Sequence, residues 1–190
     1  SGSGDELPVS AFSVDGTFPT GTSQYEKSGI ADFIPIWDDA NLCTQCNKCV
    51  AICPHAAIRA KVVSNEELIS APQGLKFVPA KGRPFTEYVL QVSPEDCTGC
   101  DLCVMVCPAE SKEIEGFKSI NMHKKIEFDK VENVYWDYFI NLPDYDRTAL
   151  TITNVKGAQF LQPLFEFSGA CSGCGETPYI KLLSQLYGDS

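Results

Sequence analysis

Eight of the ten cysteines in this chain fall into two copies of one pattern. The first copy begins at Cys43 and the second at Cys97, and each reads C-x2-C-x2-C-x3-C followed directly by proline. Thiolates bind iron in iron–sulfur clusters, and three of them on one curled loop can reach three irons of a cubane. The fourth cysteine lies beyond a turn, where proline cannot continue a regular hydrogen-bond ladder. The pattern therefore predicts two [4Fe–4S] clusters.

This spacing resembles the run of two-cluster bacterial ferredoxins, in which the fourth cysteine binds the cluster of the other motif. The resemblance implies two ligand sets that cross between the motifs. Cluster A would be bound by Cys43, Cys46, Cys49 and Cys107. Cluster B would be bound by Cys97, Cys100, Cys103 and Cys53. We therefore expect the two motifs to fold as one unit with approximate two-fold symmetry.

Two other uses of clustered cysteines stay open as alternatives. Zinc sites also contain C-x2-C pairs, but a longer loop usually separates the two pairs. Disulfides at this density suit small secreted domains, whereas the polar start of this chain lacks the basic and apolar regions of a signal peptide. We therefore favour iron–sulfur clusters over zinc, and zinc over disulfides.

Composition limits the class of protein. The 190 residues are 44% hydrophobic and 21% charged, which is typical of a globular chain of about one to three small domains. The net charge of −10 argues against nucleic acid as a partner, since little positive charge is available to neutralise phosphates. No apolar run approaches the roughly 20 residues that span a membrane. We expect a cytoplasmic protein of a reducing, oxygen-poor interior.

The chain divides into segments of different character. Residues 1–4 are interpreted as a candidate cloning remnant, and residues 5–38 as an extended arm with turns, since they are rich in Gly, Pro, Ser and Thr. Residues 39–115 should form the ferredoxin-like domain, which contains an insertion at 61–95. Residues 116–164 should connect this domain to the C-terminal stretch. Because there is no initiator Met, we expect a piece of a longer protein.

Hydrophobic periodicity predicts the elements around the motifs. Apolar residues at 62–63 and the alternating run at 88–92 predict strands. Apolar residues at near-helical spacing predict an amphipathic helix across 126–139. A short helix is expected to begin at 56–58, and a second extended region is expected at 149–155. The expected apolar positions of the long helix are Ile126, Val131, Val134, Tyr135, Tyr138 and Phe139.

The C-terminal stretch carries a third cysteine pair in a glycine-rich loop. Cys171 and Cys174 are separated by two residues, and Thr177 and Pro178 are interpreted as the N-cap and first residue of a helix. A loop that leads into a helix N-terminus suits anions and cofactor phosphates. His55, after the first motif, is interpreted as a surface or capping residue because the thiolates already complete the clusters.

Taken together, these residues resemble pyruvate:ferredoxin (flavodoxin) oxidoreductase, a large thiamine-dependent family. The resemblance runs from residues 5–12 through Tyr25-Glu26-Lys27 and both motifs to the glycine-rich loop. It implies that the arm is the linking domain named for a Glu-Lys-Arg triplet, in which Ser28 here replaces the arginine. It also implies that residues 165–190 begin the thiamine-binding domain. The expected fold is α+β: a two-[4Fe–4S] bacterial-ferredoxin-like domain with an insertion, flanked by an extended N-terminal arm and that first loop and helix.

The resemblance also implies site residues and an activity. Cys171 and Cys174 would supply two ligands of a third, proximal [4Fe–4S] cluster, and Glu176 would contact thiamine pyrophosphate. The complete enzyme would hold magnesium, form a homodimer, and convert pyruvate and coenzyme A to acetyl-CoA and CO2 in anaerobic metabolism. Single electrons would leave through the clusters to ferredoxin or flavodoxin. This chain would be the electron-transfer portion, without a catalytic residue or catalysis of its own.

Two other functions remain as alternatives. One is a free-standing electron carrier of the two-cluster ferredoxin type, against which the chain length and the extra cysteine pair argue. The other is a docking subunit that joins larger subunits. Exposed apolar side chains within residues 160–167 would favour the docking subunit.

Overall fold

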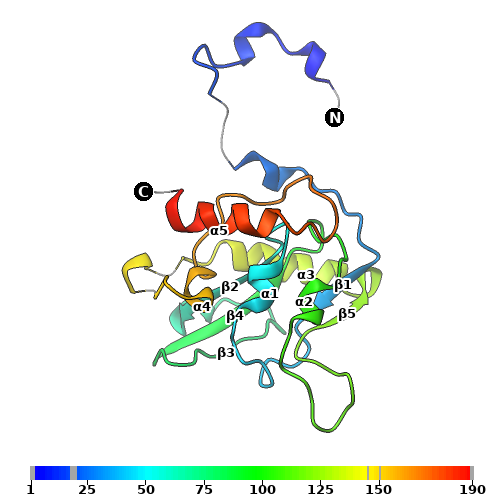
Figure 1. The fold of residues 1–190 in the computed structure, drawn as a ribbon, viewed down its shortest axis with the longest axis vertical. Coiled ribbons are helices and arrows are strands. Elements are labelled where there is room, and N and C mark those ends of the chain that lie inside the picture. Colours follow the sequence, from blue (N-terminus) through cyan, green and yellow to red (C-terminus); the bar gives the residue numbers. More distant parts are fainter. Residues whose placement is uncertain (1–2, 18–20, 145, 150, 189–190) are drawn as a thin grey trace.

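The computed structural model describes residues 3–17, 21–144, 146–149 and 151–188. The N-terminal arm is largely exposed, and Figure 1 shows its start extending away from the rest of the molecule. Its regular structure consists of short 3-10 turns at Gly4–Glu6, Val9–Ala11 and Thr22–Tyr25. Within the described residues, no helix combines the length and the hydropathy needed to cross a membrane.

Two antiparallel sheets hold the cysteine motifs. β1 (Phe33–Ile36) pairs with β5 (Asn121–Lys124), and β2 (Ile58–Ser64) pairs with β4 (Thr86–Val92), whose other edge carries the short β3 (Val78–Pro79). The first motif lies between β1 and β2, and the second lies between β4 and β5. Both predicted strands are confirmed, as parts of β2 and β4.

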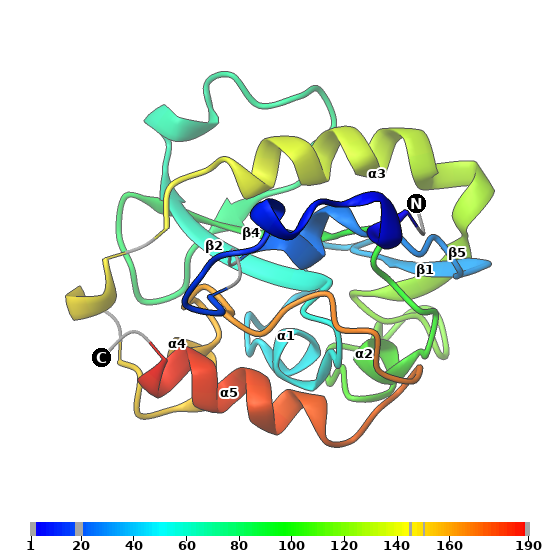
Figure 2. The same cartoon turned by 90° about the horizontal axis from the view of Figure 1, so that it is seen from above.

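Each motif contains a short helix, α1 (Lys48–Ile52) or α2 (Leu102–Met105), and the two helices contact each other. Figure 2 shows them side by side against one face of the β2–β4 sheet. The order strand, cysteine loop, helix, strand therefore occurs twice, which is the expected two-fold repeat. The α+β prediction is confirmed, although β1 and β5 lie outside the predicted bounds of 39–115. The prediction of a helix that begins at 56–58 is wrong, because Ala56 has a left-handed backbone conformation (φ 52°) and β2 begins at Ile58.

The β2–β4 sheet is covered on both faces, which explains why most residues of its two long strands are buried, including the polar Arg59, Lys61 and Gln91. Side chains alternate between the faces. On one face Tyr88 and Leu90 pack towards the cysteine loops, with Trp37 and Phe160 at the edges of the Tyr88 ring. On the other face Val89 packs against the long helix. The sheet thus lies between the cysteine loops and this helix.

The helix predicted across 126–139 is present as α3 (Lys125–Ile140), but its expected apolar positions are buried only in the C-terminal half, where Phe139 is fully buried and Tyr135 and Tyr138 are partly buried. Trp136 and Phe139 are buried and stack on each other, whereas Ile126 is 90% exposed and Val134 is 53% exposed. Large aromatic side chains bury more apolar area than Val or Ile. They therefore turn α3 so that the aromatic side faces the sheet.

Glu132 lies on α3 near Lys76 and Asp38, and we predict that it makes the stability of the protein depend on pH. Burial raises the pKa of Glu132 to about 7; Lys76 opposes this shift and Asp38 adds to it. The folded chain thus holds the proton more tightly than the unfolded chain, so stability should fall as the pH rises from 4.5 to about 7. Glu132→Gln should remove this fall and stabilise by about 1 kcal/mol at alkaline pH.

Thermal unfolding at acid and alkaline pH measures this effect. Glu127→Gln, at an exposed position of the same helix, is the matched control and should keep the normal pH dependence. An unchanged pH dependence in Glu132→Gln would contradict the prediction.

The extended region predicted at 149–155 is wrong for the residues that the structure describes. Arg147–Ala149 is a 3-10 turn, and Asn154 caps the short helix α4 (Val155–Ala158) by accepting a 2.8 Å hydrogen bond from the Gly157 N–H. A Cβ on Gly157 would lie 1.9 Å from the carbonyl oxygen of Thr151. Local capping and this close approach therefore outweigh the strand propensity of the segment.

The last helix, α5 (Thr177–Tyr187), begins one residue earlier than predicted, with Glu176 as its N-cap and Pro178 in its first turn. Its buried face is polar: Lys181 and Gln185 are buried, whereas Leu183 is 60% exposed. Gln185 donates a 2.8 Å hydrogen bond to the carbonyl oxygen of a buried leucine on the segment before α5. Hydrogen bonds, rather than an apolar stripe, dock this helix.

Candidate metal centres

The first three cysteines of each motif lie on loops with the same backbone shape. Gln45 and Asn47 in the first loop have φ angles of 57° and 58°, and the equivalent Gly99 and Asp101 in the second have 68° and 63°. These left-handed residues turn the chain twice between successive cysteines. Asn and Asp accept this conformation more readily than most residues. The two loops are therefore equivalent in geometry as well as in sequence.

Backbone N–H groups within these loops point at cysteine sulfur. The N–H of Gln45 donates to the Sγ of Cys43 at 3.3 Å, and that of Gly99 donates to the Sγ of Cys97 at 3.4 Å. A hydrogen bond to the charged form of an acid favours that form. In both loops this hydrogen bond favours the thiolate of the first cysteine and so opposes burial, which raises the pKa of Cys43 and Cys97.

Gly99 brings the second loop against the strand that precedes the first loop. Its φ is +68°, and an added Cβ would lie 3.1 Å from the carbonyl oxygen of Phe33 and 3.5 Å from the Cβ of Ala31. We predict that Gly99→Ala destabilises the protein by about 1–2 kcal/mol, since both the left-handed backbone and the contact are unfavourable.

Gly82→Ala is the matched control for this prediction. Gly82 has a similar φ of +77° but open space around the position of a Cβ. Denaturant unfolding of both variants should show the larger loss for Gly99→Ala. Equal losses would mean that the approach to Phe33 contributes nothing.

The fourth cysteine of the second motif lies beside the first loop. Burial raises the pKa of Cys49, and the charges of Cys43, Cys46 and Cys107 raise it further. Repulsion between thiolates falls with distance. Cys107 is therefore a neighbour of the first loop although it follows the second in sequence.

The fourth cysteine of the first motif lies beside the second loop. Burial raises the pKa of Cys97 to about 12; the N–H of Gly99 opposes this shift, and the charges of Cys53 and Cys100 add to it. Burial also raises the pKa of Cys103, and among the neighbouring thiols the charge of Cys53 adds most to this rise. One cavity is lined by all four cysteines assigned to cluster B: Cys53, Cys97, Cys100 and Cys103.

Two buried polar atoms in this cavity have no partner within the described chain. They are His55 Nε2 and Thr98 Oγ1. Buried polar groups in native proteins are almost always hydrogen-bonded, so these two atoms are candidate partners for a group bound at this site. The interpretation of His55 as a surface residue is wrong: it is 3% exposed, and its Nδ1 donates to the carbonyl oxygen of Ser168 at 3.1 Å.

The residues of this cavity fit an iron–sulfur cluster. Four thiols form a soft ligand set of the kind that binds zinc or iron–sulfur clusters. In the part of the chain that the structure describes, no three His, Cys, Asp or Glu side chains are arranged to hold a single metal ion. All ten cysteines are free thiols. The two ligand sets nevertheless remain predictions, as does the identity of the bound group.

The third cysteine pair lies on the second motif. The hydroxyl of Ser172 donates to the carbonyl oxygen of Thr98 at 3.2 Å, and a Cβ on Gly173 would lie 3.7 Å from the Cβ of Cys100. This contact places the C-terminal loop against the cavity assigned to cluster B. The spacing of the pair alone contained no signal for this position.

Cys171 and Cys174 lie within a tight turn at the start of α5. The N–H of Cys174 donates to the carbonyl oxygen of Cys171 at 3.0 Å, and Cys171 is exposed. Backbone N–H groups of Thr177 and Glu176 lower the pKa of Cys174. The turn thus favours a thiolate at Cys174. The predicted roles of the pair and of the exposed Glu176 remain predictions.

An ion pair that sequence analysis missed fastens the arm beside the second motif. Lys27, in the Glu-Lys-Ser triplet, lies 2.5 Å from the carboxylate of Asp96, whose side chain is 2% exposed. Ser93 also donates to this carboxylate, at 2.5 Å. The ammonium lies 4.9 Å above the ring of Phe167, which precedes the third cysteine pair. The triplet was the only sequence signal for this contact.

Comparison with known proteins agrees with the assignment of the two cysteine motifs. A family model for EKR, a domain of unknown function, matches residues 1–31, and one for a 4Fe-4S dicluster domain matches residues 42–111. The chain is 56% identical over 190 residues to the "Probable pyruvate-flavodoxin oxidoreductase" of Escherichia coli (strain K12). It is 54% identical over 188 residues to the "Pyruvate-flavodoxin oxidoreductase" of Nostoc sp. (strain PCC 7120 / SAG 25.82 / UTEX 2576).

A third relative is the "Pyruvate dehydrogenase [NADP(+)]" of Cryptosporidium parvum, which is 50% identical over 193 residues. These alignments cover 99%, 98% and 98% of this chain, respectively. They cover only 16%, 16% and 9% of the relatives. The chain therefore spans about a sixth of the length of the first two.

Proposed function

Because this chain corresponds over nearly all of its length to one segment of the pyruvate-flavodoxin oxidoreductases, we propose that it is the electron-transfer portion of such an enzyme. The complete enzyme would oxidise pyruvate with coenzyme A to acetyl-CoA and CO2. When bound, thiamine pyrophosphate supplies the electron sink for decarboxylation, and [4Fe–4S] clusters exchange one electron each. Cytoplasmic location, a homodimeric state and magnesium belong to the same proposal.

The observation that carries the proposal is the contact between the third cysteine pair and the second motif. The loop of Cys171 and Cys174 contacts the Thr98–Cys100 loop, so the residues assigned to cluster B lie beside it. The helix α2, which carries Cys103 of set B, contacts α1, which carries Cys49 of set A. We propose that electrons follow this order, from the C-terminal loop past set B to set A.

The two alternatives have less support. A free-standing carrier does not explain why the chain matches only a portion of much longer relatives, or why it has a third cysteine loop. The docking subunit required exposed apolar residues within 160–167. Phe160 and Leu161 are buried, whereas Leu164 is 52% exposed. The segment is therefore mainly part of the core of this chain.

A double substitution in the full-length oxidoreductase tests the proposed function. Cys97→Ala with Cys100→Ala should abolish reduction of flavodoxin by pyruvate, since it removes two ligands of set B. Release of CO2 in the first turnover should persist because the thiamine site lies elsewhere. Unchanged flavodoxin reduction would overturn the proposal, whereas loss of both reactions would place these cysteines in the thiamine site itself.

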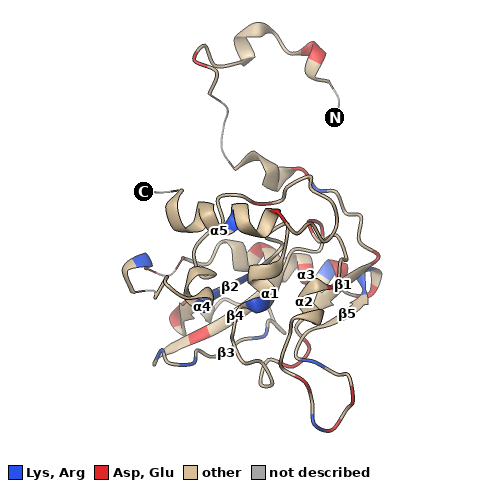
Figure 3. Ribbon diagram, viewed as in Figure 1, with Lys and Arg blue, Asp and Glu red and all other residues tan. Residues whose placement is uncertain are grey.

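We further propose that an acidic electron carrier, flavodoxin or ferredoxin, docks beside set A. Lys81, Arg83 and Lys156 line a cleft there, and Figure 3 shows positive residues on the loop between β3 and β4. The ammonium of Lys81 donates to the carbonyl oxygen of Cys43 at 2.9 Å. Burial lowers the pKa of Lys156, and the charges of Arg83 and Lys81 lower it further. This concentration of positive charge on a chain of net charge −10 would attract an acidic partner.

Reversing one charge of this cleft should slow reduction of the carrier. In the full-length enzyme, we predict that Lys81→Glu slows flavodoxin reduction at low ionic strength about tenfold and weakens its dependence on salt. Lys130→Glu, at an exposed position on α3, is the control. Stopped-flow measurement over a range of salt concentrations gives both quantities. An equal effect of the two substitutions would place the docking site elsewhere.

A further inference from the structure

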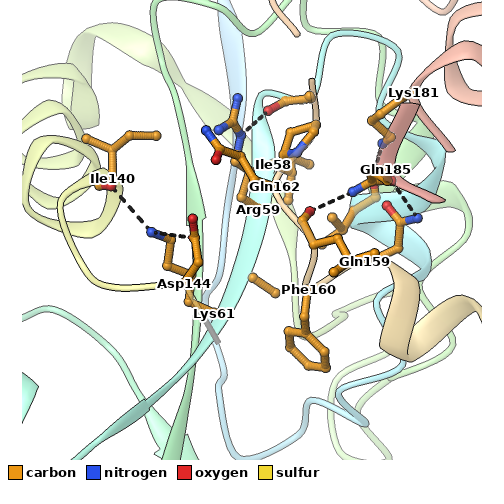
Figure 4. Close-up of a pocket in the computed structure, with 15 residues that line it drawn as sticks. Ile58, Arg59, Lys61, Ile140, Asp144, Gln159, Phe160, Gln162, Lys181 and Gln185 are labelled. Carbon is orange, nitrogen blue, oxygen red and sulfur yellow. Dashed lines mark hydrogen bonds and ion pairs between the residues drawn. The ribbon is translucent and has the colours of Figure 1, made fainter. Parts of the chain in front are cut away.

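Lys181 on α5 is a buried cation at the end of the first cysteine motif. It is 1% exposed, and its ammonium donates to the carbonyl oxygens of Val50 and Cys53, the latter at 3.1 Å. Figure 4 shows Lys181 and Gln185 reaching from α5 towards the interior. The lysine thus comes from the helix that follows the third cysteine pair and ends beside a predicted ligand of cluster B.

The charges around Lys181 come mainly from cysteines. Burial lowers the pKa of Lys181 to about 8. The charge of Cys53 opposes this shift, Arg59 adds to it, and the charge of Cys49 opposes it more weakly than that of Cys53. Within the described residues, no carboxylate forms an ion pair with Lys181, and the Glu166 carboxylate nearby pairs with Arg59. A buried charge requires a compensating charge. A [4Fe–4S] cluster with four thiolates carries about two negative charges and would supply it.

The second motif has a counterpart of this lysine. Val104 follows Cys103 as Val50 follows Cys49, and its carbonyl oxygen accepts a 2.8 Å hydrogen bond from the ammonium of Lys118. Lys118 also donates to the carbonyl oxygen of the residue after Val104, at 3.4 Å. Both short helices therefore direct carbonyl groups at a lysine from elsewhere in the chain.

The two lysines differ in exposure to solvent. Lys181 is buried, whereas Lys118 is partly exposed. A charge acts more strongly through the protein interior than through water and salt. The two lysines thus occupy similar places in the two motifs, but the charge of Lys181 acts more strongly than that of Lys118. This difference breaks the approximate two-fold symmetry of the motifs.

We propose that Lys181 raises the reduction potential of the cluster bound by Cys53, and that Lys118 raises that of the cluster bound by Cys107 to a smaller extent. Reduction adds an electron to a cluster that is already negative, so a nearby fixed cation favours the reduced form. The buried lysine has the larger effect and therefore separates the two potentials. Lys181 reaches Cys53 only when α5 packs against the first motif. Because α5 follows the third cysteine loop, this packing also sets the potential of cluster B, which lies nearest that loop.

This inference rests on the proposed function only in assuming the two clusters. Its test is an EPR-monitored redox titration of the full-length oxidoreductase. Lys181→Gln keeps hydrogen-bond donors but removes the charge, and Lys181→Arg keeps the charge. We expect a lower potential for cluster B in Lys181→Gln and a potential near that of the unmodified enzyme in Lys181→Arg. Lys118→Gln, the matched control, should lower the potential of cluster A by less.

Each outcome has a distinct meaning. Two assembled clusters whose potentials do not respond to Lys181→Gln, or respond equally to Lys118→Gln, would overturn the inference and leave the proposed function intact. A fall in potential in Lys181→Arg would also overturn it, and this variant decides the matter if Lys181→Gln does not assemble. Absence of the two clusters from the unmodified enzyme would instead overturn the proposed function.

Discussion

Cys46→Ala combined with Cys107→Ala should leave one complete cluster in this chain, although the two substitutions lie in different motifs. Both residues belong to set A, so cluster B keeps all four ligands. After anaerobic reconstitution, we expect about four irons per chain instead of about eight, and an EPR signal without spin–spin interaction. The physical reason is that Cys107 lies beside the first cysteine loop, where its charge acts on Cys49.

Cys46→Ala combined with Cys53→Ala is the matched opposite. Both substitutions lie in the first motif, but Cys53 belongs to set B, so each cluster loses one ligand and iron should be nearly absent. If each motif instead bound its own cluster, the two double variants would exchange results. Iron analysis of the pair therefore decides between crossed and uncrossed ligands without any assignment of spectra.

Arg59→Met should be the most destabilising single substitution outside the cysteines. Arg59 on β2 forms a buried ion pair with Glu166, and the side chains are only 9% and 12% exposed. Its Nε also donates to the carbonyl oxygen of Ala56 at 3.0 Å, and its guanidinium lies 4.9 Å from the ring centre of Phe167. Removing the arginine leaves a buried carboxylate unpaired, which costs about 3–5 kcal/mol.

Denaturant unfolding measures this loss, and two further variants identify its cause. Glu166→Gln added to Arg59→Met should recover part of the stability, since no buried charge then remains. Asp144→Asn removes an ion pair with Lys61 in which the carboxylate side chain is 49% exposed, and it should cost less than about 1 kcal/mol. A small effect of Arg59→Met would show that Glu166 reaches water in solution.

Local features of the fold could be predicted because their causes lie close together in sequence. The cysteine spacing is a short repeat, so its duplication predicts two equivalent loops. The run at 88–92 is a strand because alternate side chains cover opposite faces of the sheet. The arm at 5–38 is rich in turn-forming residues, and most of its described residues before β1 form exposed turns.

Other features could not be predicted because they depend on distant partners. Leu183 is apolar but 60% exposed, whereas α5 buries Lys181, whose acceptors lie on α1 and at its end. His55 is buried because Ser168, far along the chain, accepts its hydrogen bond. The Lys27 ion pair likewise joins residues of separate segments. Such polar contacts leave no periodic trace in a single sequence.

The central claim is that this chain holds two clusters that carry electrons. The most direct measurement is iron and acid-labile sulfide per chain under anaerobic conditions, together with the EPR spectrum of the dithionite-reduced protein. We predict about eight irons, about eight sulfides and two interacting spins. Bound zinc with almost no iron or sulfide would contradict the account.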